Sequence, residues 1–295
     1  MQASAHRPAA GIFWQVMTGL NFVAVTAIVK HVGSDVPAAQ AAFLRYFLGL
    51  VFVIPMIRPI LSAHLTRRQM TLFGARAVLH TGAVILWFFS MTQITIAEVT
   101  AMNYLSPIYV TLGAALLLGE KIAIRRIIAI GVALLGAIII LRPGFRELSP
   151  GHIAMLGTAL MFAGGYLIMK VMSSEVNAAV VVGMLSLFVT LGLAPFAYAV
   201  WVPVTAEQLG WLFLVACFAT AGHYTMTLAF AAAPLAVTQP VTFLQLIWSV
   251  ALGAAFFNEA IDIWVVLGGT LIMAAVSFIA WREQVLKKRA AGLAG

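Results

Sequence analysis

The sequence predicts an all-α integral membrane protein with ten transmembrane helices arranged as two inverted five-helix repeats. Three observations lead to this prediction. Hydrophobic residues make up 63% of the 295 residues and charged residues only 9%, against about 25% charged in an average soluble domain. The mean hydropathy is +1.05, and apolar runs long enough to cross a bilayer recur along the chain. The second half of the chain also repeats the first half at a nearly constant offset.

Ten apolar runs appear when the chain is divided at its charges and at its proline and glycine clusters. A run of ~20 residues crosses the ~30 Å hydrocarbon core of a bilayer as a helix. The expected spans are 12–31, 38–57, 71–92, 97–118, 124–141, 151–171, 177–200, 208–230, 235–257 and 263–281. An even number of spans places both termini on the same side of the membrane.

Lysine and arginine are distributed unequally between the two sets of loops. One set, which includes both termini, holds twelve: Arg7, Arg58, Arg67, Arg68, Lys121, Arg125, Arg126, Lys170, Arg282, Lys287, Lys288 and Arg289. The other set holds Lys30, Arg142 and Arg146. By the positive-inside rule we expect a multi-pass protein with both termini in the cytoplasm.

An internal repeat relates the two halves. Shifts of 140 and 139 residues align residues of the same type, including Thr18 with Thr158, Phe22 with Phe162, Lys30 with Lys170, Pro55 with Pro195 and Glu120 with Glu259. The predicted repeats are residues 1–145 and 146–295. Because each repeat holds five helices, the second must enter the membrane from the opposite side, as in many secondary transporters. Glu120 is then expected at the cytoplasmic face and Glu259 at the external face.

Signatures of enzymes and of nucleic-acid-binding proteins are absent from the sequence. It contains no phosphate-binding glycine loop, no Gly-x-Ser-x-Gly motif and no metal-spaced His/Cys cluster. We therefore expect no catalytic residues, no cofactor and no metal site. The net charge of +8 comes from residues scattered at span ends rather than gathered on one patch, which argues against nucleic acid as a partner. The expected partners are a small-molecule substrate and the lipid bilayer, and the oligomeric state stays open.

Polar and aromatic side chains within the spans are the candidate substrate-binding residues, because burying polar groups in a membrane is costly unless they face a cavity or a partner. His80 lies near the middle of the third span, and His223 lies in the repeat-related eighth span. The alternative is that the histidines are hydrogen-bonded packing residues and that the aromatic rings fill the bundle interior. The full candidate set is Asn21, His80, Trp87, Asn103, Tyr104, Tyr166, His223, Tyr224, Gln239, Phe243 and Gln245.

The nine acidic residues all fall at span ends or in loops. The sequence thus contains no central carboxylate to relay protons, which leaves histidine-linked proton coupling or uncoupled transport. Arg45 and Arg76 lie within or near spans, and both are expected to snorkel to the membrane surface. Arg45 has a second interpretation, as a cation that binds a substrate carboxylate.

Prolines in matched positions mark places where helical hydrogen bonds are missing. Pro55 and Pro195 are expected to bend their spans. Pro107 and Pro240 are predicted hinge points for alternating access, with static kinks as the alternative.

Several motifs make the chain similar to the ten-helix branch of the drug/metabolite transporter superfamily with two EamA-type domains. The resemblance covers nearly the whole chain and is carried by residues 97–107, 117–121 (Leu-Leu-Gly-Glu-Lys), 131–144, 236–240 and 257–259. The second copy departs from the pattern, because Asn258 replaces the usual glycine before Glu259 and Leu246 stands where the first copy has Pro107. The resemblance implies a bacterial inner-membrane carrier that works by alternating access and most often exports metabolites such as amino acids.

The expected function is therefore transport of small organic metabolites. Aromatic rings, amides and histidines in one cavity suit an amphipathic solute such as an aromatic or large neutral amino acid or a related compound, and the family resemblance alone favours its export. An uptake carrier and a multidrug or nucleoside-type exporter on the same fold are the alternatives. An intramembrane enzyme or a scaffold ranks last, since an enzyme needs clustered His, Asp or Glu at depth and a scaffold needs no inverted repeat.

Overall fold

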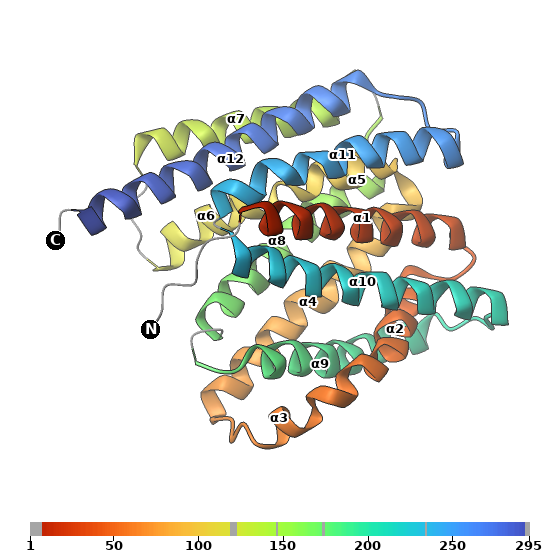
Figure 1. The fold of residues 1–295 in the computed structure, drawn as a ribbon. Helices are drawn as coiled ribbons and strands as arrows, with labels where there is room; N and C mark the ends of the chain where they lie inside the picture. Colours follow the sequence, from red (N-terminus) through yellow and green to blue (C-terminus); the bar gives the residue numbers. More distant parts are fainter. Residues whose placement is uncertain (1–7, 119–122, 146, 173–174, 234, 293–295) are drawn as a thin grey trace.

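The computed structural model describes residues 8–118, 123–145, 147–172, 175–233 and 235–292. Its elements are helices that run back and forth across one bundle (Figure 1). They are α1 (Pro8–Val32), α2 (Ala38–Gly49), the 3-10 helix η1 (Leu50–Met56), α3 (Ile57–Leu61), α4 (Arg67–Gln93), α5 (Ile96–Asn103), α6 (Ser106–Leu118), α7 (Ile124–Leu141), α8 (Pro150–Met172), α9 (Ala178–Ala199), α10 (Ala206–Ala232), α11 (Leu235–Phe257) and α12 (Ile263–Gly292).

The ten predicted spans are confirmed. Within the described residues, eight stretches are long and apolar enough to cross a membrane, with α2, η1 and α3 forming one of them. The remaining two spans are α5 followed by α6, which is the fourth along the chain, and α11, which is the ninth. The predicted end of the last span is wrong: α12 continues beyond residue 281 to Gly292. Arg, Glu, Gln, Lys and Leu follow residue 281, and these residues favour a helix whether or not lipid surrounds it.

The predicted continuous helix over 97–118 is also wrong. The structure divides it into α5 and α6, with Tyr104 and Leu105 forming tight turns to Ala101 and Met102. Pro107 explains the break, since it lacks a backbone N–H and its ring would clash with the carbonyl four residues earlier. A proline is well tolerated in the first turn of a helix, which is where Pro107 lies in α6. Transporters commonly place their binding sites at such interrupted helices.

The two prolines that the repeat aligns have different surroundings. Pro55 lies in η1, where the second span tightens into a 3-10 helix. Pro195 lies inside α9, which remains α-helical through it. The second span therefore changes its helix type around the proline in the first repeat but not in the second repeat. Position 240 lies within α11, but the side chain of Pro240 is outside the described residues.

Helix pairings exchange between the two repeats, as an inverted repeat requires. The first span of each repeat packs on the third span of the other, so α1 lies along α10 and α8 lies along α4 (Figure 1). A threonine crosses each of these interfaces: Thr18 donates to Thr225 at 3.0 Å, and the repeat-related Thr158 donates to the Ala83 carbonyl at 3.4 Å. The second spans pair with each other as α2 and α9, and the fifth spans as α7 and α12.

The fifth spans, α7 and α12, lie side by side along one flank of the bundle (Figure 1). They approach so closely at Gly136 that a Cβ atom there would lie 2.6 Å from the carbonyl oxygen of Gly268. Ion pairs join the two helices near both ends, Arg126 with Glu283 and Arg142 with Asp262. Small residues allow this contact between backbones, as is common for helices packed in membranes.

Candidate functional site

The centre of the bundle is organised around one face of α4. Arg76, His80 and Trp87 follow the four- and seven-residue spacing that places side chains on the same side of a helix. His80 is the middle residue of α4, about 20 Å from each end at ~1.5 Å per residue. Arg76 and His80 are 5% and 7% exposed. This α4 face therefore brings polar groups to the depth at which a membrane tolerates them least.

His80 is held by contacts from two other helices. Its Nε2 atom lies 2.8 Å from the hydroxyl of Tyr46 in α2. Its ring lies 5.1 Å from that of Phe162 in α8. These contacts agree with the alternative that His80 is a hydrogen-bonded packing residue. They also hold the imidazole ring in one orientation, which a binding residue needs as well. The hydroxyl of Tyr46 was not predicted as a site group.

Phe162 is the centre of an aromatic group. It stacks on Tyr166 at 6.1 Å with an interplanar angle of 26°, and Trp87 meets it edge-on at 6.1 Å. The structure thus brings together three of the predicted residues, His80, Trp87 and Tyr166, around a phenylalanine that was not among them. The repeat alignment of Phe22 with Phe162 was the signal that could have identified it.

The second copy repeats this histidine–phenylalanine contact. The ring of His223 in α10 meets that of Phe22 in α1 at 5.3 Å and 84°. Because Phe22 and Phe162 are aligned by the repeat, the two histidines lie against matched phenylalanines from matched helices. We refer to Arg45, Tyr46, Arg76, His80, Trp87, Phe162, Tyr166 and His223 as the central site.

The interruption between α5 and α6 adds polar atoms inside the bundle. The Oδ1 atom of Asn103 and the Oγ atom of Ser106 are buried and have no hydrogen-bond partner among the described residues. The same holds for Nε1 of Trp87. Tyr104 is satisfied, since its hydroxyl donates to the Thr242 carbonyl of α11 at 2.9 Å. Buried polar atoms without partners are rare in proteins and are places where water or a ligand binds.

The remaining candidates are less closely grouped. Asn21 donates to the carbonyl of Met17 in its own helix at 2.7 Å. Phe243 and Gln245 are half-buried in α11, and Tyr224 is 66% exposed. The side chain of Gln239 lies outside the described residues.

Two arginines lie beside His80. The guanidinium carbon of Arg45 lies 3.9 Å from the centre of the Tyr46 ring. Arg76 donates from Nη1 to the Val181 carbonyl of α9 at 3.3 Å. The expectation that Arg76 snorkels to the surface is wrong, because packing against α8 and α9 leaves its side chain buried.

One end of the bundle is closed by a partly buried ion pair. Lys30 at the end of α1 lies 2.5 Å from Glu259, which follows α11, and also donates to the Ile94 carbonyl at 2.8 Å. Glu259 accepts from the backbone N–H of Ile96, the first residue of α5, at 3.0 Å. We call this end, with Lys30, Ile94 and Glu259, the Lys30 end. Glu259 of the second repeat thus contacts α1 and α5 of the first repeat, whereas Glu120 lies outside the described residues.

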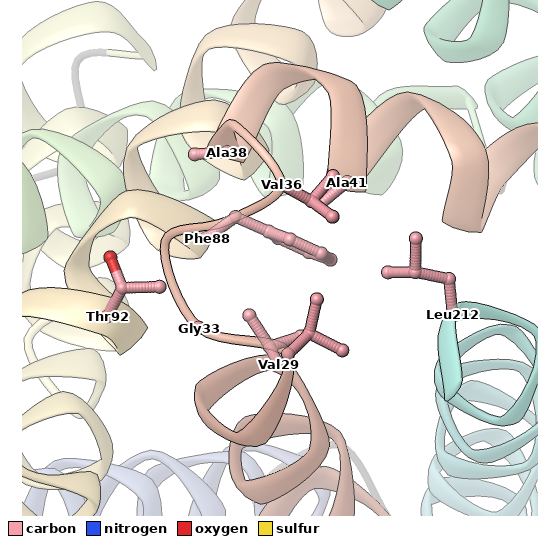
Figure 2. Close-up of a pocket in the computed structure, with 9 residues that line it drawn as sticks. Val29, Gly33, Val36, Ala38, Ala41, Phe88, Thr92 and Leu212 are labelled. Atoms are coloured by element: carbon pink, nitrogen blue, oxygen red, sulfur yellow. The ribbon is translucent and has the colours of Figure 1, made fainter. Parts of the chain in front are cut away.

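A second buried pair lies at the Lys30 end. His152 of α8 lies 3.1 Å from Glu98, and both side chains are at most 5% exposed. Glu98 also completes a capping box with Thr95 at the start of α5. Nearby, a cavity of about 10 Å³ lies among apolar side chains, where Phe88 of α4 faces Val29 of α1 and Leu212 of α10 (Figure 2). A single water needs at least this much room, so the Lys30 end is tightly packed.

A metal centre has no support in the part of the chain that the structure describes, since no group of three or more His, Cys, Asp or Glu side chains is placed to hold an ion. The arrangement offers binding groups instead: rings, amides and cations at mid-depth, below a closed end.

The sequence profile of the EamA-like transporter family matches the chain twice, over residues 9–142 and 149–281. The chain belongs to this family. As an EamA-like member of the drug/metabolite transporter superfamily, it is a multi-pass membrane transporter of small molecules and not an enzyme.

Curated relatives extend over almost the whole chain but differ in cargo. The chain is 30% identical over 293 residues to a protein named riboflavin transporter in Rhizobium johnstonii, covering 96% of this chain and 94% of the relative. It is 24% identical over 267 residues to a pseudopaline exporter of Pseudomonas aeruginosa (90% and 94% covered). It is also 24% identical over 288 residues to an S-adenosylmethionine uptake transporter of Rickettsia prowazekii (93% of each). Family membership therefore sets neither cargo nor direction.

A solved crystal structure has the same fold. It superposes with a TM-score of 0.63 at 16% identity and covers 93% of this chain and 98% of its own.

Proposed function

We propose that this EamA-like transporter carries ring-bearing organic metabolites across the membrane by alternating access, with the central site as its binding site. The observation that supports this most directly is the aromatic group of Trp87, Phe162 and Tyr166 beside the buried His80. Such rings stack on planar solutes, and the unpartnered atoms of Trp87 and Asn103 are suited to bind the polar end of a solute. Export of aromatic or large neutral amino acids is the narrower form of this proposal.

The closed Lys30 end supports the alternating-access part. Lys30 and Glu259 join helices from opposite repeats, so this end opens only if the repeats separate there. We further propose that Pro107, at the interruption between α5 and α6, and Pro240 are the hinge points. Pro107→Ala should then lower the maximal transport rate more than it changes the apparent affinity, and an unaltered rate would count against a hinge.

We propose a bacterial cytoplasmic membrane as the location, with both termini in the cytoplasm and the Lys30 end outside. The twelve-to-three distribution of basic residues supports this orientation. Cys217 is the only cysteine, so a Cys217→Ser variant provides a cysteine-free background. In intact cells an impermeant maleimide should label Glu147→Cys, in the loop between α7 and α8, and should leave Gln284→Cys near the end of α12 unlabelled. The reverse labelling pattern would overturn the orientation.

Counterflow in proteoliposomes tests the cargo. Vesicles preloaded with tryptophan, phenylalanine or riboflavin should exchange labelled solute saturably if the proposal holds. Trp87→Ala should weaken transport about 2- to 10-fold, the effect of one lost aromatic contact, whereas Trp281→Ala, at an exposed ring in α12, should not. Absence of saturable flux for all ring-bearing solutes would contradict the proposal. Inside-out and right-side-out vesicles then decide between export and uptake.

A further inference from the structure

Four basic side chains converge on the central site from three helices. Arg45 comes from α2, Arg76 and His80 from α4, and His223 from α10. The guanidinium of Arg45 lies over the Tyr46 ring at 3.9 Å, the Tyr46 hydroxyl lies 2.8 Å from Nε2 of His80, and Arg76 lies one helical turn from His80 on α4. The two arginines, which carry the permanent positive charge of this group, both come from the first repeat, and His223 of the second repeat lies against Phe22 of α1.

The hydrogen-bonding capacity of the arginines is largely unused. Arg76 is 5% exposed, its only hydrogen bond within the described structure goes from Nη1 to Val181, and its Nε atom has no partner. Arg45 contacts the face of Tyr46 but makes no hydrogen bond or ion pair with the described residues. Each guanidinium can donate five hydrogen bonds in a planar fork that matches a carboxylate or a phosphate.

The described carboxylates that form ion pairs do so with bases other than Arg45 and Arg76. Among the described residues, five acidic side chains pair with other bases: Glu98 with His152, Glu175 with Arg68, Glu259 with Lys30, Asp262 with Arg142 and Glu283 with Arg126. Holding unpaired cations inside a membrane protein is costly and usually marks a substrate or ion path. No carboxylate of the described residues supplies this negative charge, which leaves a bound molecule as its source.

We infer that Arg45 and Arg76, with His80 beside them, form an anion-binding site, and that the solute carried by this protein bears a carboxylate or phosphate group without an adjacent ammonium group. The ring of the solute lies against Phe162 and Tyr166, while the anionic group meets the guanidinium of Arg76. A zwitterionic amino acid fits less well, because its ammonium group would lie among cations with no carboxylate beside it. This inference rests on the proposed transport function and narrows it from ring-bearing solutes to anionic ones.

Phenyl compounds that differ only in charge test the inference. Binding to the purified full-length chain is measured by calorimetry at fixed pH for phenylpropionate, phenylethyl phosphate, phenylalanine, phenylethylamine and phenylpropanol. We expect one or both anions to bind about tenfold or more tightly than the zwitterionic, cationic and neutral compounds. The comparison of phenylpropionate with phenylethyl phosphate shows which anionic group is preferred.

Arginine variants locate the effect. Arg76→Gln and Arg45→Gln should each weaken binding of the preferred anion about tenfold or more, and Arg76→Lys should retain part of it. Arg58→Gln, at an exposed arginine in α3, is the matched control and should bind normally. Circular dichroism and size-exclusion profiles identify any variant that fails to fold. If Arg76→Gln does not fold, Arg45→Gln provides the test.

The outcomes separate this inference from the proposed function. Equal binding of phenylalanine, phenylpropanol and phenylpropionate, unchanged in both arginine variants, overturns the anion site but leaves transport of ring-bearing solutes in place. Binding of inorganic phosphate or chloride that phenylpropionate does not displace also overturns it. If no probe is transported but phenylpropionate binds through Arg76, the transport proposal fails and the anion site stands.

Discussion

The Lys30 end and the central site both hold charged side chains that are buried or partly buried, but they differ in how those charges are compensated. At the Lys30 end, Glu259 is 10% exposed and meets both Lys30 and a backbone N–H, and Glu98 meets His152. At the central site, Arg45 and Arg76 have no acidic partner among the described residues. The charges at the Lys30 end are therefore compensated by side chains of the protein, whereas the arginines of the central site would be compensated by a bound anion.

This difference in charge compensation indicates that the Lys30 end stabilises the fold and that the central site binds a ligand. A buried ion pair with additional hydrogen bonds joins the elements that carry it and resists the loss of either partner. A buried cation without a counter-charge destabilises the empty protein and becomes favourable only when an anion arrives. The Lys30 end is therefore expected to respond to substitution mainly in stability, and the central site mainly in binding.

The largest expected effect is at the Lys30 end. Glu259→Gln leaves Lys30 without its counter-charge while keeping an acceptor for the Ile96 N–H, so we expect a loss of about 3 kcal/mol in unfolding free energy. Thermal unfolding of the purified chain in detergent measures it. Replacing both partners, as Lys30→Met with Glu259→Leu, should recover part of the loss. An unchanged melting temperature in Glu259→Gln would remove the distinction between the two regions.

The second effect has the opposite sign. Arg76→Met replaces a buried, unpaired cation with an apolar side chain of similar length, so we expect the unliganded chain to gain about 2 kcal/mol while anion binding is lost. The readout is the melting temperature with and without phenylpropionate. Destabilisation of a correctly folded Arg76→Met variant would mean that Arg76 holds α4 to α9 through Val181 instead.

Much of the fold was predictable because membrane insertion leaves a strong mark on the sequence. The span 124–141 coincides with α7, and the repeat offset aligned Thr18 with Thr158, which cross equivalent helix interfaces in the structure. The interruption at Tyr104 and Leu105 was not predicted, since hydropathy continues through it and only Pro107 signals it. Apolar composition predicts that a segment lies in the membrane but not that its helix is continuous.

The site was predictable only in part. His80, Trp87 and Tyr166 were identified because polar and aromatic residues are conspicuous in apolar spans, whereas Tyr46 and Phe162 resemble ordinary packing residues until the helices are assembled. Arg76 was expected at the surface because a long side chain near a span end normally reaches water. Its burial depends on packing against α8 and α9, and no pattern along α4 alone encodes those contacts.

A smaller effect is expected at the hydrogen bond that positions His80. Tyr46→Phe removes the hydroxyl that lies 2.8 Å from Nε2 but keeps the ring beneath Arg45, so we expect a loss of about 1 kcal/mol in stability and weaker anion binding. Tyr198→Phe, at a ring that is 85% exposed, is the control and should change neither quantity. Equal effects of the two substitutions would show that Tyr46 acts through packing alone.

The smallest effect is expected at the exposed pair of Arg68 and Glu175, which lies outside both regions and provides their baseline. Arg68 donates to both carboxylate oxygens at 2.7 and 3.0 Å, and this hydrogen bonding, with that of Gln69, holds the pKa of Glu175 below its ordinary value of 4.5. A lowered pKa in the folded state stabilises the protein above the ordinary pKa, and the contribution disappears as the pH falls through the lowered value. Arg68→Gln should therefore lower the melting temperature slightly at neutral pH, less than Glu259→Gln does, and the difference from the wild type should vanish in acid. If the difference in melting temperature between Arg68→Gln and the wild type persists after Glu175 is protonated, Arg68 contributes through packing. The Arg68–Glu175 pair could then no longer serve as the reference for the buried charges.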